Sequence, residues 1–206
     1  MTRMPPLETP RLLVRPFTPE DLDAIHRILD VELADADVAD VGDVADGGAL
    51  TREARARWLT WTVLGYEQLA WLCQPPYGDR AVALREGGEV IGAVGFVPCL
   101  SPFEQIPSGV AGGAAARGYT AELGLYYAIS PAHRRRGYAA EAAGAMIAYA
   151  FEALRVARVV AMTTHDNLAS QAVMRRLGMR VETNPLPEPP WMQVVGVIKV
   201  ARVDAR

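Results

Sequence analysis

Apolar residues recur at helical spacing in two stretches of the second half of the chain. Over 137–154 they predict an amphipathic helix whose apolar face carries five residues: Ala143, Met146, Ile147, Ala150 and Leu154. A second helix is predicted over 168–177 and ends at Gly178, a residue that favours helix ends. Its inward face is predicted to hold Ala169, Ala172, Val173 and Leu177.

The first half of the chain also predicts two helices. One begins at the capping residue Thr18, has Pro19 in its first turn, and runs to about Leu33. The other covers 51–72 and carries four large aromatic residues, Trp58, Trp61, Tyr66 and Trp71. Large aromatic rings have much apolar surface to bury, so these residues are predicted to pack in the core.

Strands are predicted where short apolar runs are bounded by turn residues. These runs cover 12–15, 80–85, 89–97, 120–129, 158–164 and 194–200, and a long loop is predicted over Pro98–Tyr119. Because helices alternate with the strands, we expect an α/β (α+β) fold with a mixed sheet and helices on both of its faces. The 206 residues are expected to form a single domain over 1–206.

Composition narrows the classes of protein that this chain can belong to. The formal net charge is -3 and half of the residues are hydrophobic, which disfavours a nucleic-acid-binding protein and favours a packed core. The two cysteines, Cys73 and Cys99, form neither a disulfide framework nor a metal motif, so no metal is expected. No apolar run is long enough to cross a bilayer, and we expect a cytoplasmic protein without a membrane partner.

The most informative segment is 126–139, in which a strand ends at Ser130-Pro131 and a basic loop opens a helix. The first turn of a helix offers unpaired N–H groups that attract a phosphate, and Gly137 allows close approach of the anion. Arg134, Arg135 and Arg136 add guanidinium groups suited to phosphate oxygens. Neither a P-loop ending nor a GxGxxG fingerprint is present, and a solvated run of arginines stays open as the alternative.

Three segments together resemble one known family. Arg134-x-x-Gly137-x-Ala139 is similar to the Q/R-x-x-G-x-G/A signature of the GNAT N-acetyltransferases. The segment 164–179 resembles that family's N-x-x-S-x-x-V-x-x-x-x-G-F motif, and 7–16 is similar to the opening of its RimJ/RimL-like branch. The resemblance implies a single-domain GNAT fold whose mostly antiparallel sheet is splayed at the strand that binds coenzyme A. It also implies acetyl-CoA as cosubstrate.

The resemblance further implies which residues hold that cosubstrate. Backbone groups of one strand would bond the pantetheine arm: Tyr127, Ala128 and Ile129. The pyrophosphate would be held by the loop and the first turn of the helix: Arg135, Arg136, Gly137, Tyr138, Ala139 and Ala140. Arg134 fills the first signature position, and Asn167 and Ser170 would face the same cleft. A helix cap for Asn167 and a surface hydroxyl for Ser170 are the alternatives.

The chemistry implied is direct attack of a primary amine on the acetyl thioester. Glu122, near the beginning of the strand, is predicted as the general base, and a solvent-facing glutamate is the alternative. The family often places a tyrosine acid and a glutamate base where this chain has Met174 and Met162, so no acid is assigned. The acceptor is expected to be a protein N-terminus or a small-molecule amine. A non-catalytic acyl-CoA-binding module and a homodimer are left open.

Overall fold

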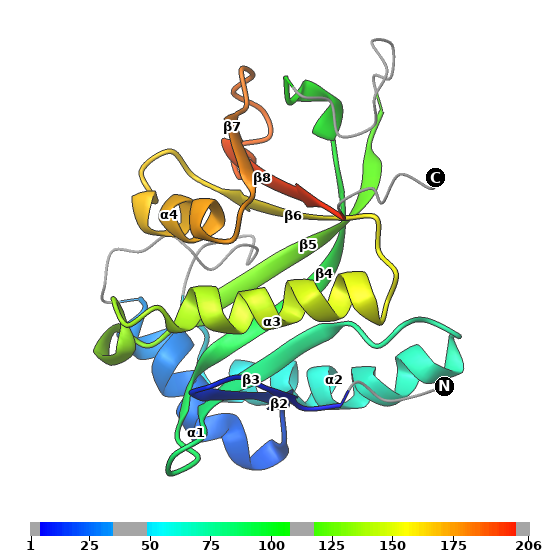
Figure 1. Cartoon of the computed structure of the whole chain (residues 1–206). Coiled ribbons are helices and arrows are strands. Elements are labelled where there is room, and N and C mark those ends of the chain that lie inside the picture. The colour runs from blue at the N-terminus through cyan, green and yellow to red at the C-terminus, as the bar shows by residue number, and fades with distance from the viewer. Residues whose placement is uncertain (1–4, 35–48, 108–117, 201–206) are drawn as a thin grey trace. The chain divides into compact units, whose positions relative to one another are not determined.

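The structure, a computed structural model, describes residues 5–34, 49–107 and 118–200 (Figure 1). Its helices are α1 (Leu22–His26), α2 (Arg52–Trp71), α3 (Tyr138–Glu152) and α4 (Leu168–Arg176). The strands are β1 (Leu7–Glu8), β2 (Leu12–Pro16), β3 (Gly78–Leu84), β4 (Val90–Ser101), β5 (Thr120–Ile129), β6 (Arg158–Thr163), β7 (Arg180–Thr183) and β8 (Val194–Lys199).

The described strands form one mixed sheet in the order β1-β2-β3-β4-β5-β6-β8-β7. Neighbours from β1 to β4 pair antiparallel, as do β6 with β8 and β7 with β8, whereas β5 runs parallel to β6. The chain divides into two compact units. The first comprises Met1–Val97 and Tyr126–Met146, and the second comprises Pro98–Leu125 and Ile147–Arg206. The mixed, mostly antiparallel sheet with its helices confirms the predicted fold class.

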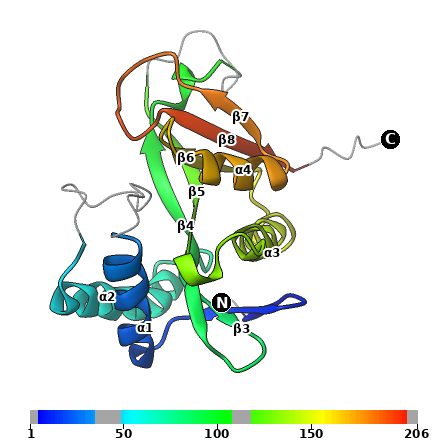
Figure 2. The same cartoon turned by 90° about the vertical axis from the view of Figure 1, so that its left-hand side faces the viewer.

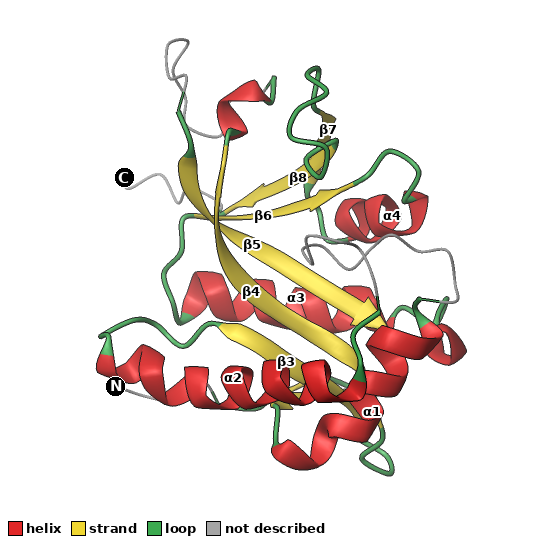
Figure 3. Cartoon of the chain, turned by 180° about the vertical axis from the view of Figure 1, so that it is seen from behind, coloured by secondary structure: helices red, strands yellow, loops and turns green. Residues whose placement is uncertain are grey.

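In the first unit, α1 and α2 cover one face of β3 and β4, while the beginning of α3 lies on the opposite face (Figures 2 and 3). The core under α1 and α2 is built from buried apolar side chains: Phe17, Ile25, Ile28, Leu29, Leu33, Leu59, Ala81, Ala83, Val90, Ala93 and Ala128. Four of the five residues of the predicted apolar face of α3 are buried: Ala143, Met146, Ile147 and Ala150. The fifth, Leu154, follows the end of the helix and is only partly buried.

The first helical region changes its winding along its length. It starts with a 3-10 turn at Pro19–Asp21, continues as α1, and ends in a π-helical stretch at Arg27–Glu32. The carboxylate of Asp21 accepts a hydrogen bond from the backbone N–H of Thr18 at 2.8 Å, as the predicted helix start requires. At the other end, the backbone N–H of Leu33 donates to the carbonyl of Ile28 at 3.1 Å, which is the wider π-helical spacing.

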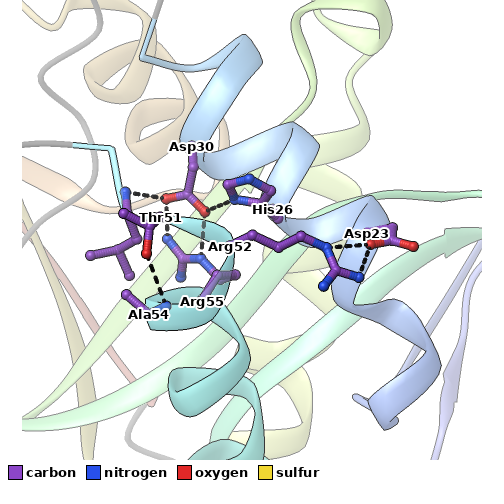
Figure 4. A network of polar contacts seen from close by, with 8 residues as sticks. Asp23, His26, Asp30, Thr51, Arg52, Ala54 and Arg55 are labelled. Carbon is purple, nitrogen blue, oxygen red and sulfur yellow. Dashed lines mark hydrogen bonds and ion pairs between the residues drawn. The ribbon is translucent and has the colours of Figure 1, made fainter.

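A buried ion pair ties this π-helical stretch to α2 (Figure 4). Asp30 accepts from Arg55 through both carboxylate oxygens, at 2.7 and 2.6 Å, and also from the backbone N–H of Leu50 at 2.9 Å. His26 lies 2.9 Å from the same carboxylate. Burial opposes ionisation of Asp30, but the hydrogen bonds from Arg55, His26 and Leu50 outweigh it and lower its pKa. The network therefore fixes the end of the first helical region against α2.

In the second unit, α4 packs against the strands β6, β7 and β8. The sulfur of Met174 lies 3.0 Å from the position that a Cβ on Gly196 would take, so this face of β8 fits closely under the helix. Other buried residues form a separate apolar cluster: Phe103, Ile106, Val160, Met192, Val195 and Val197. Because side chains alternate along a strand, Val195 and Val197 point to the face of β8 opposite Gly196.

Two predicted packing faces are wrong. On α4, Ala169 and Ala172 are exposed, and the buried residues are Ser170, Gln171 and Met174. Alanine has little apolar surface to bury, so the larger Met174 decides which face of the helix turns inward. On α2, Trp61 and Trp71 are 70% and 79% exposed and do not join the core.

The predicted loop over Pro98–Tyr119 is wrong at its beginning. β4 continues to Ser101, and a 3-10 turn follows at Phe103–Gln105. Phe103 and Ile106 are buried, so this part of the segment contributes to the core of the second unit. Residues 108–117 and the acidic segment 35–46 lie outside the described residues. In the described part of the chain, no helix is both long and apolar enough to span a membrane.

Candidate cofactor and active site

The loop between β5 and α3 has a backbone suited to an anion. After a 3-10 turn at Pro131–His133, Arg135 and Gly137 adopt left-handed conformations with φ of 59° and 81°. Left-handed residues within a turn direct successive backbone N–H groups into a common concavity that binds anions. α3 then begins at Tyr138, and the N–H groups of its first turn have no partner within the helix.

The side chains of this loop add positive charge. Arg134, Arg135 and Arg136 are exposed, and none of them forms an ion pair with another residue in the described ranges. A diphosphate carries negative charge and presents several acceptor oxygens, which guanidinium groups bind well. The loop therefore has the backbone shape and the charge that a phosphate-bearing cofactor requires.

The turn between β1 and β2 clamps the beginning of α3. Glu141 accepts from the Thr9 hydroxyl at 2.6 Å and from the Arg11 backbone N–H and Nε at 3.0 and 2.7 Å. Arg11 also donates to the carbonyl of Arg136 at 2.9 Å, and its guanidinium lies 4.5 Å from the ring centre of Tyr138. Burial opposes ionisation of Glu141, but these hydrogen bonds outweigh it and lower its pKa. The clamp holds the anion-binding loop from the side of the first strands.

A second contact fixes the end of β5. The hydroxyl of Ser130 donates to the carboxylate of Glu32, which also pairs with Arg27, and the backbone N–H of Ser130 donates to the carbonyl of Ile91 at 2.8 Å. A Cβ on Gly92 would lie only 2.1 Å from the carbonyl oxygen of Ala128, so the two strands approach closely here. Of the predicted pantetheine strand, Ala128 and Ile129 are buried and Tyr127 is partly buried.

The remaining predicted cofactor residues lie in the second unit. The side-chain oxygen of Asn167 accepts from the backbone N–H of Ser170 at 2.9 Å, so Asn167 caps α4. Its side-chain nitrogen, Nδ2, is buried and has no hydrogen-bond partner among the described residues. A buried donor without a partner is costly, so this amide fits a ligand that supplies an acceptor. Ser170 is buried and is not a surface hydroxyl.

Comparison with known proteins decides the family. A family model described as "Acetyltransferase (GNAT) domain" matches residues 11–180. The chain belongs to the GNAT acetyltransferase family. Acetyltransferases of this family use acetyl-CoA as the acetyl donor. The loop before α3, which matches the family signature, lies within the matched range.

Two curated relatives come from Bacillus subtilis. The uncharacterised N-acetyltransferase YnaD is 36% identical over 64 residues, which is 31% of this chain and 36% of YnaD. The uncharacterised N-acetyltransferase YoaA is 27% identical over 188 residues, covering 86% of this chain and 84% of YoaA. The match to YnaD thus spans about a third of that relative's length, whereas the match to YoaA spans most of both proteins.

Solved structures share the fold of this GNAT chain. An acetyltransferase from Agrobacterium tumefaciens superposes with a TM-score of 0.66 at 23% identity, covering 96% of each chain. RimJ of Mycobacterium smegmatis in complex with CoA-disulfide gives 0.62 at 19% identity, covering 98% of this chain and 88% of RimJ. The ribosomal-protein-S5-alanine acetyltransferase of Vibrio fischeri gives 0.62 at 15%, covering 95% and 97%.

Glu122, the predicted base, is held by an arginine. Its side chain is 3% exposed, and its two carboxylate oxygens accept from Nε and Nη2 of Arg158. The thiol of Cys99 lies 3.6 Å from the backbone carbonyl of Glu122. Glu122 is thus not the solvent-facing glutamate of the alternative interpretation. The role of its carboxylate as a base stays a prediction.

The positions that often hold the family's acid and base carry no titratable group here. Met174 is fully buried on the inner face of α4, and Met162 packs against the apolar cluster of the second unit. His165 is exposed, and its backbone N–H donates to Gln193 at 2.8 Å. His133 lies beside the arginine loop, where its Nδ1 is buried without a partner among the described residues. In those same residues, no cluster of three or more potential metal ligands occurs.

The first unit also holds a cavity of about 210 Å³ between α2 and the strands β2 and β3. Its walls are mostly apolar and aromatic: Pro16, Phe17, Val63, Tyr66, Glu67, Leu69, Pro76, Tyr77 and Arg80. None of the predicted site residues lines it.

Next to Arg80, burial raises the pKa of Asp79 to about 6, against the lowering effect of the charges on Arg80 and Arg55.

Sequence reasoning missed the residues that support the loop. Glu32 and Ser130 are 98 positions apart, so nothing in the sequence pairs them. The clamp was easier to predict, because Thr9 and Arg11 lie in the opening segment that resembles the RimJ/RimL-like branch. In the sequence, however, that segment indicated only a likeness to the family and no contact. Its contact with Glu141 gives the likeness a structural reason.

Proposed function

We propose that this GNAT chain binds acetyl-CoA and transfers its acetyl group to a primary amine. The observation that carries the proposal is the loop before α3, where Arg135 and Gly137 are left-handed and three arginines are exposed. The pyrophosphate binds the backbone N–H groups of this loop and of the first turn of α3, up to Ala139 and Ala140. The arginines add charge around it.

The pantetheine arm follows the end of β5. Backbone groups of Tyr127, Ala128 and Ile129 bond its amides. The buried Nδ2 of Asn167 supplies a donor to a carbonyl oxygen of the same arm, and this use accounts for a nitrogen that has no partner in the described residues. Ser170, one turn further along α4, lines the same track.

The reaction is direct attack of the neutral amine on the thioester carbonyl. An α-amino group has a pKa of about 8 and a lysine of about 10.4, so the amine must give up a proton near neutral pH. Glu122 accepts this proton, directly or through a water molecule, while Arg158 fixes the orientation of the carboxylate. The thiol of CoA has a pKa near that of free cysteine, about 8.5, so it can leave as the thiolate without a dedicated acid.

The acceptor that we favour is a protein N-terminus. Support comes from the fold neighbour named as a ribosomal-protein-S5-alanine acetyltransferase and from the likeness of the opening segment to the RimJ/RimL-like branch. A small-molecule amine is the other acceptor class. The two classes are separated by measuring turnover of a panel of N-terminal peptides and small amines, with the release of free CoA thiol as the readout.

The cofactor site is tested by comparing two glycines with the same backbone conformation. Gly137 and Gly87 both have φ of 81°, but Gly87 lies in the turn between β3 and β4. Alanine at either position costs about 1–2 kcal/mol of backbone strain. We expect Gly137→Ala to weaken CoA binding at least tenfold by calorimetry, because the concavity changes shape. Gly87→Ala should leave it unchanged, and equal affinities in the two variants would contradict the site.

A non-catalytic acyl-CoA-binding module is the second candidate. The observation that favours it is the burial of Met174 and the placement of Met162 in an apolar cluster, at positions where the family often uses an acid and a base. Calorimetric binding of acetyl-CoA without thiol release on any amine would support this module. Amine-dependent thiol release that depends on Glu122 would support the enzyme.

A further inference from the structure

Ser130 joins the two halves of the proposed cofactor track, residues 127–140. It follows the end of β5, whose residues 127–129 are proposed to bond the pantetheine arm. After a 3-10 turn comes the loop 134–140, proposed to hold the pyrophosphate. A ligand that spans two subsites gains affinity only when the subsites are held at a separation that it can bridge. The orientation of Ser130, which is 1% exposed, therefore affects the affinity for acetyl-CoA.

Three hydrogen bonds fix Ser130. Its backbone N–H donates to the carbonyl of Ile91 at 2.8 Å, and its carbonyl accepts from the backbone N–H of His133, also at 2.8 Å. These two bonds use main-chain atoms and tie Ser130 to β4 and to the turn that follows. The third bond is different, because the hydroxyl of Ser130 donates to the carboxylate of Glu32, 98 positions earlier in the chain. This bond depends on both side chains.

The π-helical winding of Arg27–Glu32 places the carboxylate for this bond. In an α-helix, residues five positions apart lie about 140° apart around the axis. With π-helical winding they stack, because each N–H bonds the carbonyl five residues earlier. The ion pair between Arg27 and Glu32 has this spacing, so α-helical winding would separate its partners. One carboxylate oxygen of Glu32 pairs with Arg27, and the other accepts from Ser130.

The surroundings of Glu32 favour a strong and well-placed bond. Its side chain is 23% exposed, and hydrogen bonds to an ionised acceptor are about twice as strong as neutral ones. The neighbouring Asp30 ties the same stretch to α2 through two bonds from Arg55. π-helical turns are rare and are frequent at functional sites. The stretch thus holds Glu32 in a fixed position beside the cofactor track.

We propose that Glu32 is a positioning residue for acetyl-CoA. Through the hydroxyl of Ser130, it sets the orientation of residues 127–129 relative to the loop 134–140, and it does not itself contact the cosubstrate. The proposal rests on the proposed function, because it concerns the same cofactor track. It assigns part of the affinity for CoA to a side chain that lies outside the family signature.

Equilibrium binding of two ligands tests this role. CoA spans both halves of the track, whereas ADP carries the pyrophosphate without the pantetheine arm. Glu32→Ala should weaken CoA binding at least about fivefold and ADP binding less than about twofold, because each half keeps its own bonds. Glu32→Gln keeps a side-chain oxygen that can accept from Ser130, so it should restore most of the affinity for CoA.

The matched control is Val31→Ala. Val31 lies in the same π-helical stretch and is 48% exposed, so its truncation should leave the binding of both ligands unchanged. If Glu32→Ala binds CoA as tightly as wild type, or weakens CoA and ADP equally, the positioning role is wrong. If the wild-type chain binds neither ligand, the proposed function fails and the positioning role fails with it.

A double-mutant cycle tests whether Glu32 acts through Ser130. Ser130→Ala should weaken CoA binding as much as Glu32→Ala does, and the double variant should be no weaker than either, because all three lack the same bond. Melting temperatures of the ligand-free variants show whether each of them is folded. Losses of affinity that add in the double variant would overturn the proposed connection.

Discussion

At the residue scale, Glu122 and Arg158 form the pair on which the proposed chemistry depends. The carboxylate is buried and both of its oxygens accept from one guanidinium, so its orientation is fixed. Fixed orientation suits a general base, because the distance to the substrate proton decides its efficiency. The same pair would also serve a purely structural role, and kinetics separate the two.

The first prediction concerns Glu122→Gln. If Glu122 is the base, kcat should fall by about 10²–10⁴ and the remaining activity should rise with pH as more amine is neutral. Arg158→Gln is the comparison, because it breaks the same pair but keeps the carboxylate. Its kcat should fall much less than that of Glu122→Gln. If kcat fell equally in both variants and in proportion to the fall in melting temperature, the pair would serve stability alone.

The second prediction concerns Asp79, whose pKa burial raises to about 6. The unfolded value is about 3.9, so between these two pH values the folded chain binds a proton that the unfolded chain does not. The contribution of Asp79 to folding stability should therefore fall as pH rises from about 4 to 6, by on the order of 2 kcal/mol. Asp79→Asn should remove this slope. Urea unfolding at several pH values measures the slope. If the free energy of unfolding of wild type and Asp79→Asn changed in parallel with pH, the raised pKa would be contradicted.

At the element scale, the clamp of Thr9 and Arg11 on Glu141 connects the opening strands to the first turn of α3. A glutamate near a helix N-terminus also interacts favourably with the helix dipole. Because Arg11 bonds the carbonyl of Arg136 as well, the clamp restrains both the helix and the loop before it. The element that binds the cofactor is therefore positioned by a segment about 130 residues earlier in the chain.

The third prediction concerns Glu141→Gln. Loss of a charged acceptor with three bonds should reduce stability by about 1–3 kcal/mol and raise the KM for acetyl-CoA several-fold, with kcat little changed. Since its pKa is lowered on folding, the contribution of Glu141 is present above about pH 4.3 and lost as pH falls through the folded value. Arg52→Gln, which breaks an exposed pair with Asp23, is the control and should change neither quantity.

The elements were largely predictable from the sequence, and their packing only in part. The bounds of β5 match the predicted 120–129, and α3 lies within the predicted 137–154, because strong periodicity and clear stop residues mark them. The inward face of α4 was not predictable, since alanines mark a helical face weakly. The exposure of Trp61 and the contact of Glu32 with Ser130 depend on tertiary structure, which the local pattern does not contain.

At the scale of the whole molecule, the predicted cofactor residues are divided between the two units. Tyr127 to Ala140 belong to the first, whereas Asn167 and Ser170 belong to the second. The strands β4 and β5 and the helix α3 contribute residues to both units. A ligand that binds residues of both units stabilises both against unfolding, so it should slow hydrogen exchange in each unit.

The fourth prediction follows from this division. At about one hundred times its dissociation constant, CoA should stabilise the chain by about 2.7 kcal/mol, which corresponds to a rise of about 5–10 °C in melting temperature. Hydrogen exchange with CoA should slow at 134–140 and also at 167–171. Gly137→Ala should reduce both effects at the same CoA concentration, the stabilisation to about 1.4 kcal/mol or less. Protection confined to 134–140 would leave the phosphate site in place and remove Asn167 and Ser170 from the proposed track, because a ligand slows exchange only where it binds or where its binding suppresses opening.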